Sequence, residues 1–275
     1  MKRLISSVLL LSLALIFILT CGCGKAVTPA TIDILKTGKS DCIVINTGSH
    51  IVMIDTGEIN NLPEIRSYMI KNGYEKIDTL ILTHYDKDHI GCADIIISNY
   101  NVETVIESKA VSESNEYKSY HKTLSKKGIS PVKLTENHGF SFDDCQFHID
   151  IPQKSKYKKH NDNNLSLIVS MKCGKTSFLF CADAMETRLE EFMQGEKTKY
   201  DFVKLPYHGN YLDNYESFLD FTTPLYTAIT CSKKNPPAEK TFKLLKKRSI
   251  DVFLTKNGEI NIKTDGKAVI INVKE

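Results

Sequence analysis

Four side chains that can bind a metal ion fall within six consecutive positions: His84, Asp86, Asp88 and His89. The apolar residues 77–82 lead directly into them, a pattern typical of a buried strand. Side chains two positions apart in an extended segment face the same way, so His84, Asp86 and Asp88 can converge, and His89 follows at the turn into a helix. Alone, Asp88 would be explained as a helix cap. Four such residues after one strand favour a metal site.

Two further candidate ligands follow strands later in the chain. Asp183 comes after the apolar residues 176–181, and His208 comes shortly after residues 202–205. With the first loop they supply three imidazoles and three carboxylates, about what two neighbouring divalent ions require, with one carboxylate to bridge them. We therefore predict two divalent metal ions. Zinc or manganese is expected, and the carboxylate-rich ligand set leaves iron open as well.

The N-terminus has the layout of an export signal. Residues 1–3 are basic at two positions, residues 4–19 are almost wholly apolar, and Cys21 and Cys23 follow among small residues. The apolar stretch is shorter than the roughly 20 residues of a spanning helix. A cysteine directly after such a stretch resembles a bacterial lipoprotein signal, and the glycine before Cys23 fits cleavage there better than the threonine before Cys21.

This pattern divides the chain into three parts. We predict a lipoprotein-type signal peptide at residues 1–23, a tether at 24–30 and one domain at 31–275. Lipid on Cys23 would hold the domain on the outer side of a bacterial cell membrane. Ordinary secretion and an uncleaved membrane anchor are the alternatives, and both also place the domain outside the cytoplasm.

Composition and charge limit the classes of protein. With 41% hydrophobic and 25% charged residues, the 275-residue chain is an ordinary globular protein. The formal net charge of +3 falls to about 3 − 2 = +1 without Lys2 and Arg3, which does not indicate a protein that binds nucleic acid over its whole surface. The cysteines form no Cys-x-x-Cys pair, so a structural zinc knuckle is not expected. Disulfides would fit export, but the spacing proposes no pairing.

Strands and helices alternate along the domain, which predicts sheet covered by helices. The expected helices cover residues 61–72, 90–98, 112–127, 186–193 and 238–247. The expected strands cover residues 32–35, 42–45, 51–54, 77–82, 102–106, 165–171, 176–181, 202–205, 225–229, 252–254, 260–262 and 269–271. In each half of the domain, 31–134 and 145–273, candidate ligands follow the ends of strands. This loose symmetry predicts one two-layered domain with the site where the halves meet.

The first loop resembles a known family. Thr-His-Tyr-Asp-Lys-Asp-His-Ile-Gly at residues 83–91 is similar to the His-x-His-x-Asp-His loop of the metallo-β-lactamase superfamily. Asp86 replaces the second histidine, as in the ComEC-type competence hydrolase branch. Further segments resemble that branch in the same order: Gly-Lys-Ser-Asp at 38–41, Asp-Thr-Gly at 55–57, Asn-Leu-Ser-Leu-Ile at 164–168, Phe-Cys-Ala-Asp at 180–183 and Leu-Pro-Tyr-His-Gly-Asn at 205–210.

The resemblance implies an α/β fold, a four-layer αββα sandwich with the metals at one edge. His84 and Asp86 would hold one ion, and Asp183 would bridge to a second. The second ion would be held by Asp88, His89 and His208. A metal-activated hydroxide would attack phosphorus or a carbonyl carbon.

The resemblance also implies supporting residues. Asp55 would orient metal-binding side chains by hydrogen bonds without binding the metal itself. Asn164 and His160 are the two candidates for the missing third ligand of the first ion.

The chain departs from the branch at several positions beside the site. Tyr207 replaces the first histidine of His-His-Gly, so a ligand or proton donor is missing there unless Tyr207 bonds a substrate oxygen itself. Asn235-Pro236 stands where the branch often has His-Pro.

One basic cluster has an aromatic residue inside it. Lys156, Lys158 and Lys159 surround Tyr157. They would contact phosphates while Tyr157 stacks on a base, or they form a solvated loop without function.

The expected function is that of an extracytoplasmic metal-dependent hydrolase of phosphodiesters. A nucleotide or nucleic acid is the expected substrate, the membrane is contacted through the lipid, and no protein partner is predicted. One alternative is a lactonase or β-lactamase-like hydrolase of cyclic esters or amides, against which Asp86 argues. Another is a non-catalytic binding or sensor lipoprotein, which Tyr207 motivates.

Overall fold

The computed structural model describes residues 27–274. The predicted signal peptide, Cys21, Cys23 and the first part of the tether lie outside the described residues. Within them, no helix is both long and apolar enough to cross a membrane. The ordered contacts begin before position 31, because Thr28 donates hydrogen bonds to Asp144 from its backbone nitrogen and its hydroxyl, both at 2.8 Å.

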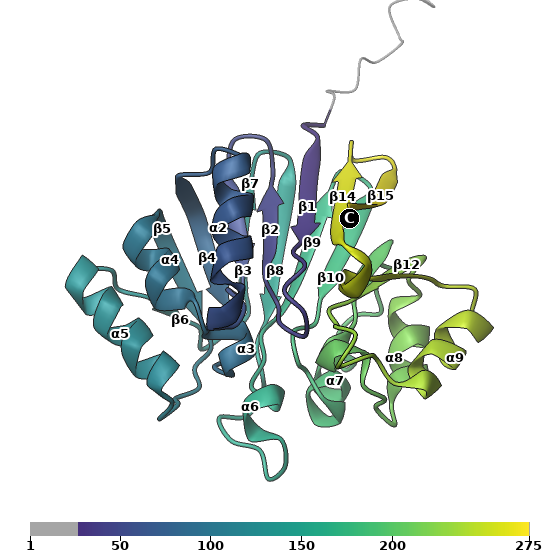
Figure 1. Ribbon diagram of the computed structural model, residues 1–275. Helices are drawn as coiled ribbons and strands as arrows, with labels where there is room; N and C mark the ends of the chain where they lie inside the picture. The colour runs from purple at the N-terminus through teal and green to yellow at the C-terminus, as the bar shows by residue number, and fades with distance from the viewer. Residues whose placement is uncertain (1–26, 275) are drawn as a thin grey trace, which may run out of the picture.

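Two large sheets form the centre of the molecule (Figure 1). The first has the order β15-β14-β1-β2-β3-β4-β5-β6. Its strands are β1 (Ala30–Ile34), β2 (Ile43–Asn46), β3 (Ile51–Ile54), β4 (Lys76–Leu82), β5 (Asn101–Glu107), β6 (Val132–Lys133), β14 (Glu259–Thr264) and β15 (Val269–Lys274).

The second sheet has the order β13-β12-β11-β10-β9-β8-β7. Its strands are β7 (His138–Phe142), β8 (Cys145–Asp150), β9 (Ile168–Cys173), β10 (Thr176–Phe180), β11 (Phe202–Lys204), β12 (Tyr226–Ile229) and β13 (Asp251–Leu254). A disulfide joins Cys145 to Cys173, which lie opposite each other on β8 and β9.

The sheets pack face to face through alternate residues of their strands. Val52 and Ile54 of β3 belong to the buried cluster between the sheets, together with Phe147 and Phe178 of the second sheet. The intervening Met53 points to the other face of β3 and is also buried. Strands buried on both faces read as continuous apolar runs, which is why the sequence shows runs and not alternation.

Helices cover both outer faces and complete four layers (Figure 1). Those on the first sheet are α2 (Leu62–Lys71), α4 (Ala93–Asn99) and α5 (Asn115–Lys127), and those on the second are α7 (Glu186–Phe192), α8 (Tyr215–Thr222) and α9 (Glu239–Lys247). Ile65, Ile96 and Leu124 share one buried cluster with strand residues of the first sheet, and Leu189 and Phe218 share another with the second. The predicted αββα sandwich is confirmed.

The expected helix at 90–98 is two helices, α3 (Lys87–Ile90) and α4. Gly91 lies between them, where the chain passes the loop after β3. A Cβ at Gly91 would lie 2.5 Å from the carbonyl oxygen of Lys87 and 2.8 Å from Cα of Glu58. The backbones therefore approach too closely for any side chain, and the first loop is held against residues 57–58. Sequence periodicity carries no information on this contact.

Parallel strands bring the candidate ligands to one edge. β3, β4 and β5 run parallel in the first sheet, as do β10, β11, β12 and β13 in the second. Their carboxyl ends are the usual place for a ligand site in sheets of this kind. The residues that follow these ends are Asp55 (β3), His84 (β4), Asp183 (β10), His208 (β11) and Thr230 (β12).

Candidate metal centre

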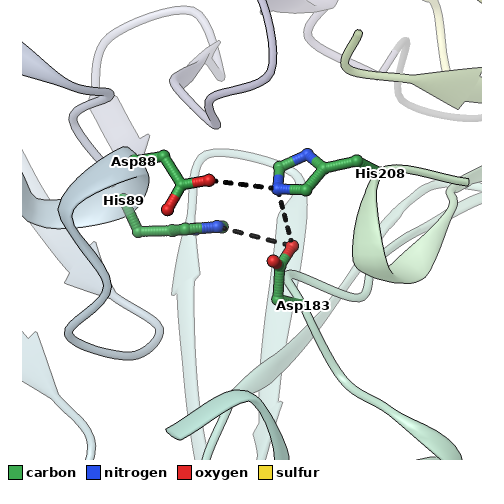
Figure 2. A group of neighbouring side chains, drawn as sticks. All are labelled: Asp88, His89, Asp183 and His208. Atoms are coloured by element: carbon green, nitrogen blue, oxygen red, sulfur yellow. Dashed lines mark ion pairs between the residues drawn. The ribbon is translucent and has the colours of Figure 1, made fainter. Parts of the chain in front are cut away.

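Four side chains converge at this edge, two from α3 and one each from the segments after β10 and β11: Asp88, His89, Asp183 and His208 (Figure 2). One ligand atom from each lies within 4.8 Å of all the others. Oδ1 of Asp183 is 3.0 Å from Nε2 of His208 and 3.4 Å from Nε2 of His89. Oδ2 of Asp88 is 3.5 Å from Nε2 of His208. Asp183 thus lies between the two rings, and the two halves of the molecule meet here.

The converging atoms are buried and lack hydrogen-bond partners. The unpartnered buried atoms of the described residues include four that lie at this edge: Nε2 of His84, His89 and His208, and Oδ1 of Asp183. A buried polar atom without a partner is costly, so native structures rarely leave one unexplained. Three imidazole nitrogens and a carboxylate oxygen are the donors that bind zinc and similar ions. The residues present therefore fit a divalent metal.

The other nitrogen of each ring is held by a neighbour. Nδ1 of His89 lies 2.7 Å from Oδ2 of Asp55. Nδ1 of His208 lies 2.8 Å from Oγ1 of Thr230. Because an acceptor at Nδ1 keeps the proton there, Nε2 presents its lone pair to the cluster. Neighbours of this kind normally orient histidine ligands.

Asp55 supports two rings at once. Its Oδ1 accepts a hydrogen bond from the backbone nitrogen of Thr83 at 2.9 Å, and its Oδ2 accepts one from the Thr83 hydroxyl at 2.7 Å. That hydroxyl oxygen lies 3.2 Å from Nδ1 of His84 and can accept its proton. Asp55 therefore holds His89 directly and His84 through Thr83, which is the supporting position predicted for it.

A buried ion pair supports the third ring. The Thr230 hydroxyl donates to Oδ1 of Asp41 at 2.7 Å, so its oxygen is free to accept from His208. The other carboxylate oxygen of Asp41 accepts from Nζ of Lys204, which also donates to the carbonyl of Ala182 at 3.2 Å. Asp41 and Lys204 are 1% and 0% exposed. The series of hydrogen bonds from Lys204 through Asp41 and Thr230 thus reaches His208, a candidate ligand.

The electrostatics of the cluster favour a cation. Burial would raise the pKa of Asp183, but the rings of His208 and His89 hold it well below the usual value. Burial would lower the pKa of both His89 and His208, but Asp183 raises each above the usual value. Asp183 therefore stays ionised. Its negative charge is balanced either by protonated rings of His89 and His208 or by a metal ion that replaces those protons.

Strained backbone surrounds the cluster. Asp55, Ala182, Tyr207 and His208 have φ angles of 58°, 48°, 49° and 52°. Residues with a Cβ seldom adopt this left-handed region, and such residues gather at functional sites, where the fold holds them in place.

The family follows from comparison with known proteins. Residues 35–229, more than half of the chain, match the model of the metallo-beta-lactamase superfamily. The chain belongs to the metallo-β-lactamase superfamily. Members of this superfamily are metal-dependent hydrolases, and the chain is assigned to that class of enzyme. Its members typically bind divalent ions in a dinuclear site.

Two curated relatives agree with the ComEC-type resemblance. ComE operon protein 3 of Bacillus subtilis (strain 168) is 29% identical over 199 residues, which cover 70% of this chain and 25% of that protein. Recombination protein 2 of Haemophilus influenzae is 27% identical over 204 residues, which cover 74% of this chain and 23% of that protein. The chain thus spans about a quarter of the length of these relatives.

Solved structures share the fold at low sequence identity. The metallo-beta-lactamase fold protein YhfI from Bacillus subtilis superposes with a TM-score of 0.56 at 12% identity, covering 89% of this chain and all of that one. A variant of the CmlA beta-hydroxylase has a TM-score of 0.52 at 13% identity, covering 82% of this chain and 52% of the other. At such identities the likeness concerns the fold alone.

His84 and Asp86 lie beside the four-residue cluster of this superfamily member. The rings of His84 and His89 are 4.1 Å apart between centroids, and Nε2 of His84 is 3.7 Å from Oδ2 of Asp86. Asp86 is partly exposed, and the neighbouring His84 ring lowers its pKa. The pair offers one nitrogen and one carboxylate next to the first set, as two neighbouring ions would require.

Asn164 is buried, and both ends of its side-chain amide form hydrogen bonds. Its Oδ1 accepts a hydrogen bond from the backbone nitrogen of Arg188 at 3.1 Å, and its Nδ2 donates to the carbonyl of Lys159 at 3.1 Å. Asn164 ends the short helix α6 (Asn161–Asn164) and ties it to α7. His160, the other candidate for a third ligand, is exposed. These two hydrogen bonds hold the Asn164 amide between Arg188 and Lys159, and its role as a supporting or ligating residue stays a prediction.

The loop before α6 does not present an aromatic face. Tyr157 is 6% exposed and donates a 2.6 Å hydrogen bond to Oε2 of Glu191. The expectation that Tyr157 stacks on a base is wrong, because the ring belongs to the core under the first sheet. Lys156, Lys158 and Lys159 are exposed, and their contact with phosphate remains a prediction.

Tyr207 lies at the margin of the cluster. Its backbone nitrogen donates to the carbonyl of Ala182 at 3.1 Å, and Nζ of Lys39 is 5.9 Å from the centroid of its ring. The ring is half-buried and packs against the core of the second sheet. A catalytic role for Tyr207 stays a prediction.

Sequence reasoning did not identify Thr83, Thr230 or Lys204 as parts of the site. Lys204 carried a usable signal, because a lysine within the apolar segment 202–205 must be paired if the strand is buried. The threonines carried none, since one hydroxyl near a strand end is common. Their role appears only when the neighbouring strands are side by side.

Proposed function

We propose that the chain is a metal-dependent phosphodiesterase that acts on DNA or a nucleotide. The observation that carries this proposal is the convergence of the buried, unpartnered Nε2 atoms of His89 and His208 with the unpartnered Oδ1 of Asp183, beside the His84 ring. The likeness to ComE operon protein 3 and Recombination protein 2 supports a substrate from the nucleic acids.

Six side chains would hold two ions, zinc or manganese. Asp88, His89 and His208 would hold one, His84 and Asp86 the other, and Asp183 would bridge them. When bound, such ions lower the pKa of water toward neutrality and neutralise the charge of a phosphoryl group.

The residues of the chain keep this site in order before substrate arrives. Asp55 and Thr230 accept the Nδ1 protons of His89 and His208, so the opposite nitrogens stay aimed at the cluster. Asp88 keeps a pKa below its usual value although burial opposes this, because His208 and His89 stabilise its charge. A set of ligands held in advance requires no reorganisation during the reaction.

We also propose that the protein works outside the cytoplasm, attached to the membrane by lipid on Cys23. The Cys145–Cys173 disulfide supports this location, because disulfides persist mainly in oxidising compartments. Labelling with a radioactive fatty acid tests the anchor. Cys23→Ala should abolish the label and Cys21→Ala should retain it, and the reverse result would move the lipid to Cys21.

The activity is tested on the full chain loaded with manganese or zinc. We expect about two metal ions per chain and cleavage of bis-p-nitrophenyl phosphate and of short single-stranded DNA. Asp88→Ala should lower the rate by at least about 100-fold, since even residues behind the ligands cost 10- to 100-fold. Circular dichroism should show that the fold is kept.

Other outcomes separate the alternatives. Hydrolysis of a cephalosporin or a lactone without phosphodiester cleavage would replace the proposal with a cyclic amide or ester hydrolase. A chain that binds at most one ion and cleaves none of these substrates would be a binding protein on this scaffold.

A further inference from the structure

We propose that a pocket beside His208 binds a second phosphate of the substrate, next to the one that reacts. Lys39 and Lys234 would supply the charge, and Asn210 and Asn235 would supply amide groups. This inference rests on the proposed function. It limits the proposed substrates to nucleotides or nucleic acids that carry at least two phosphate groups.

The pocket has a volume of about 280 Å³ and is lined by Lys39, His208, Asn210, Lys234, Asn235 and Pro236. This volume is slightly below the usual range of sites that enclose a whole small molecule. No aromatic ring other than the His208 imidazole lines it, so it offers no further surface on which a base could stack. A compact anionic group fits these properties better than a nucleoside.

Three loops build the pocket, and their packing is specific. The backbone nitrogen of Ala238 donates to the carbonyl of Gly209 at 3.1 Å. A Cβ at Gly209 would lie 3.0 Å from Cβ of Pro237, so the segment after β12 rests directly on the loop of His208. Close packing at Gly209 therefore brings Lys234 to the candidate metal centre from a part of the chain about 26 residues away.

The turn that carries Lys234 is held by its own hydrogen bonds. The backbone nitrogen of Asn235 donates to Oγ of Ser232 at 3.0 Å, and the backbone nitrogen of Ser232 donates to the carbonyl of Asn235 at 3.2 Å. The backbone beside Lys234 is thus held in place, while Lys234 itself is exposed. Such a lysine can bind an anion without a large loss of backbone conformational entropy, because its backbone is already held in place.

The charge of the pocket is positive and only weakly compensated. Its six lining residues include two lysines and no carboxylate. Nζ of Lys39 lies 4.0 Å from Oδ2 of Asp88, at the limit of ion-pairing distance. Among the residues that the structure describes, no carboxylate is paired with Lys234. If Asp88 binds a metal ion, Lys39 is left to attract an anion from the substrate.

The pocket touches the metal cluster through one residue. His208 is one of the residues that line the pocket, and its Nε2 faces Asp183 and Asp88 (Figure 2). A phosphate in the pocket would therefore lie beside the reacting phosphate and not replace it. Neighbouring phosphates along one nucleic acid strand have this relationship.

Dinucleotides with and without a terminal phosphate test the inference. Thymidine dinucleotides that carry a phosphate at the 5′ end, at the 3′ end or at neither end are given to the full chain with manganese. We expect one phosphorylated form to be cleaved with about 10-fold higher kcat/KM, mainly through KM, as one charged hydrogen bond to phosphate would provide. Lys39→Gln and Lys234→Gln should each reduce this preference, and the double variant should abolish it.

Matched controls keep the result specific. The Lys234→Gln variant should cleave the unphosphorylated dinucleotide within about twofold of the original rate, because this exposed residue is not a candidate ligand. Lys126→Gln, an exposed lysine on α5 at the far side of the molecule (Figure 1), should keep the full preference. A preference that survives in the double variant, or equal cleavage of all three dinucleotides, would overturn the inference.

Binding to the metal-free chain separates this inference from the proposed function. Calorimetry without metal measures affinity for the same dinucleotides when none is cleaved. Tighter binding of a phosphorylated form that is lost in the double lysine variant would uphold the pocket even if the metal-loaded chain cleaved no phosphodiester. Equal binding of all forms would reject the pocket and leave the phosphodiesterase proposal standing.

Discussion

Oδ2 of Asp55 lies 2.7 Å from Nδ1 of His89, and both side chains are fully buried. The contact directs the opposite ring nitrogen toward Asp183. Because the same carboxylate also binds Thr83, one side chain positions the start of the first loop and the ring near its end.

Asp55→Asn should lower metal affinity by about 10- to 100-fold. An amide nitrogen or a weaker neutral acceptor would face Nδ1 of His89, and the ring would lose its fixed orientation. Competition with a chelating dye measures the affinity. Asp78→Asn is the matched control, since Asp78, on β4, is also a buried aspartate that accepts a backbone hydrogen bond, from Ile51 at 2.7 Å, away from the cluster. Equal losses in both variants would show that Asp55 acts only on stability.

Thr230→Val should also weaken metal binding by about 10- to 100-fold, because His208 loses the acceptor of its Nδ1 proton. Valine keeps the shape of the side chain, so the fold should be retained. Thr227→Val on β12, the strand that Thr230 follows, is the control, since the Thr227 hydroxyl donates to the carbonyl of Asp251 and does not contact a candidate ligand. Unchanged metal affinity in Thr230→Val would exclude a positioning role for the threonine.

Lys204→Met should lower the free energy of unfolding by about 3–5 kcal/mol, as expected when one partner of a buried ion pair is removed. The carboxylate of Asp41 would remain buried without its counterion. In the double variant Lys204→Met/Asp41→Asn the buried charge is gone while Oδ1 can still accept from Thr230, so part of the loss should be recovered. Urea unfolding measures both variants. A double variant that is no more stable than the single one would contradict this account.

Metal affinity should fall as the pH is lowered. In the metal-free chain Asp183 raises the pKa of His89 and His208 although burial opposes it, so each ring keeps a proton to higher pH than a free histidine. Below these raised pKa values a metal ion must displace that proton, and affinity drops about tenfold per pH unit for each proton released. Calorimetry in buffers of different ionisation enthalpy counts the protons. No proton release near neutral pH would show that the rings are already neutral.

The first loop could be predicted because its information is local. An apolar run, followed by His84, Asp86, Asp88 and His89, specifies a strand and a ligand-rich turn without reference to distant residues. The break of the following helix at Gly91 could not be predicted in the same way. The break depends on contact with Glu58, which lies in the loop after β3.

Tyr157 shows where local reasoning failed, and Asn164 shows contacts that such reasoning cannot supply. Both lie in a polar stretch whose composition resembles a binding loop. Arg188 and Glu191, two residues of α7, engage their side chains and turn them into packing contacts. A polar residue has many possible partners, and the sequence does not say which one lies nearest.

The sequence by itself determined the classes of element, the two-sheet fold through its family resemblance, and the six candidate ligands at strand ends. These properties follow from periodicity and from side-chain chemistry, both of which can be read along the chain. Only the tertiary structure decided that Asp55 holds His89, that Thr230 links His208 to Asp41 and Lys204, and that Lys234 lies beside the cluster. Such relationships depend on which strands and loops become neighbours, and close packing between the two halves of the chain sets those distances.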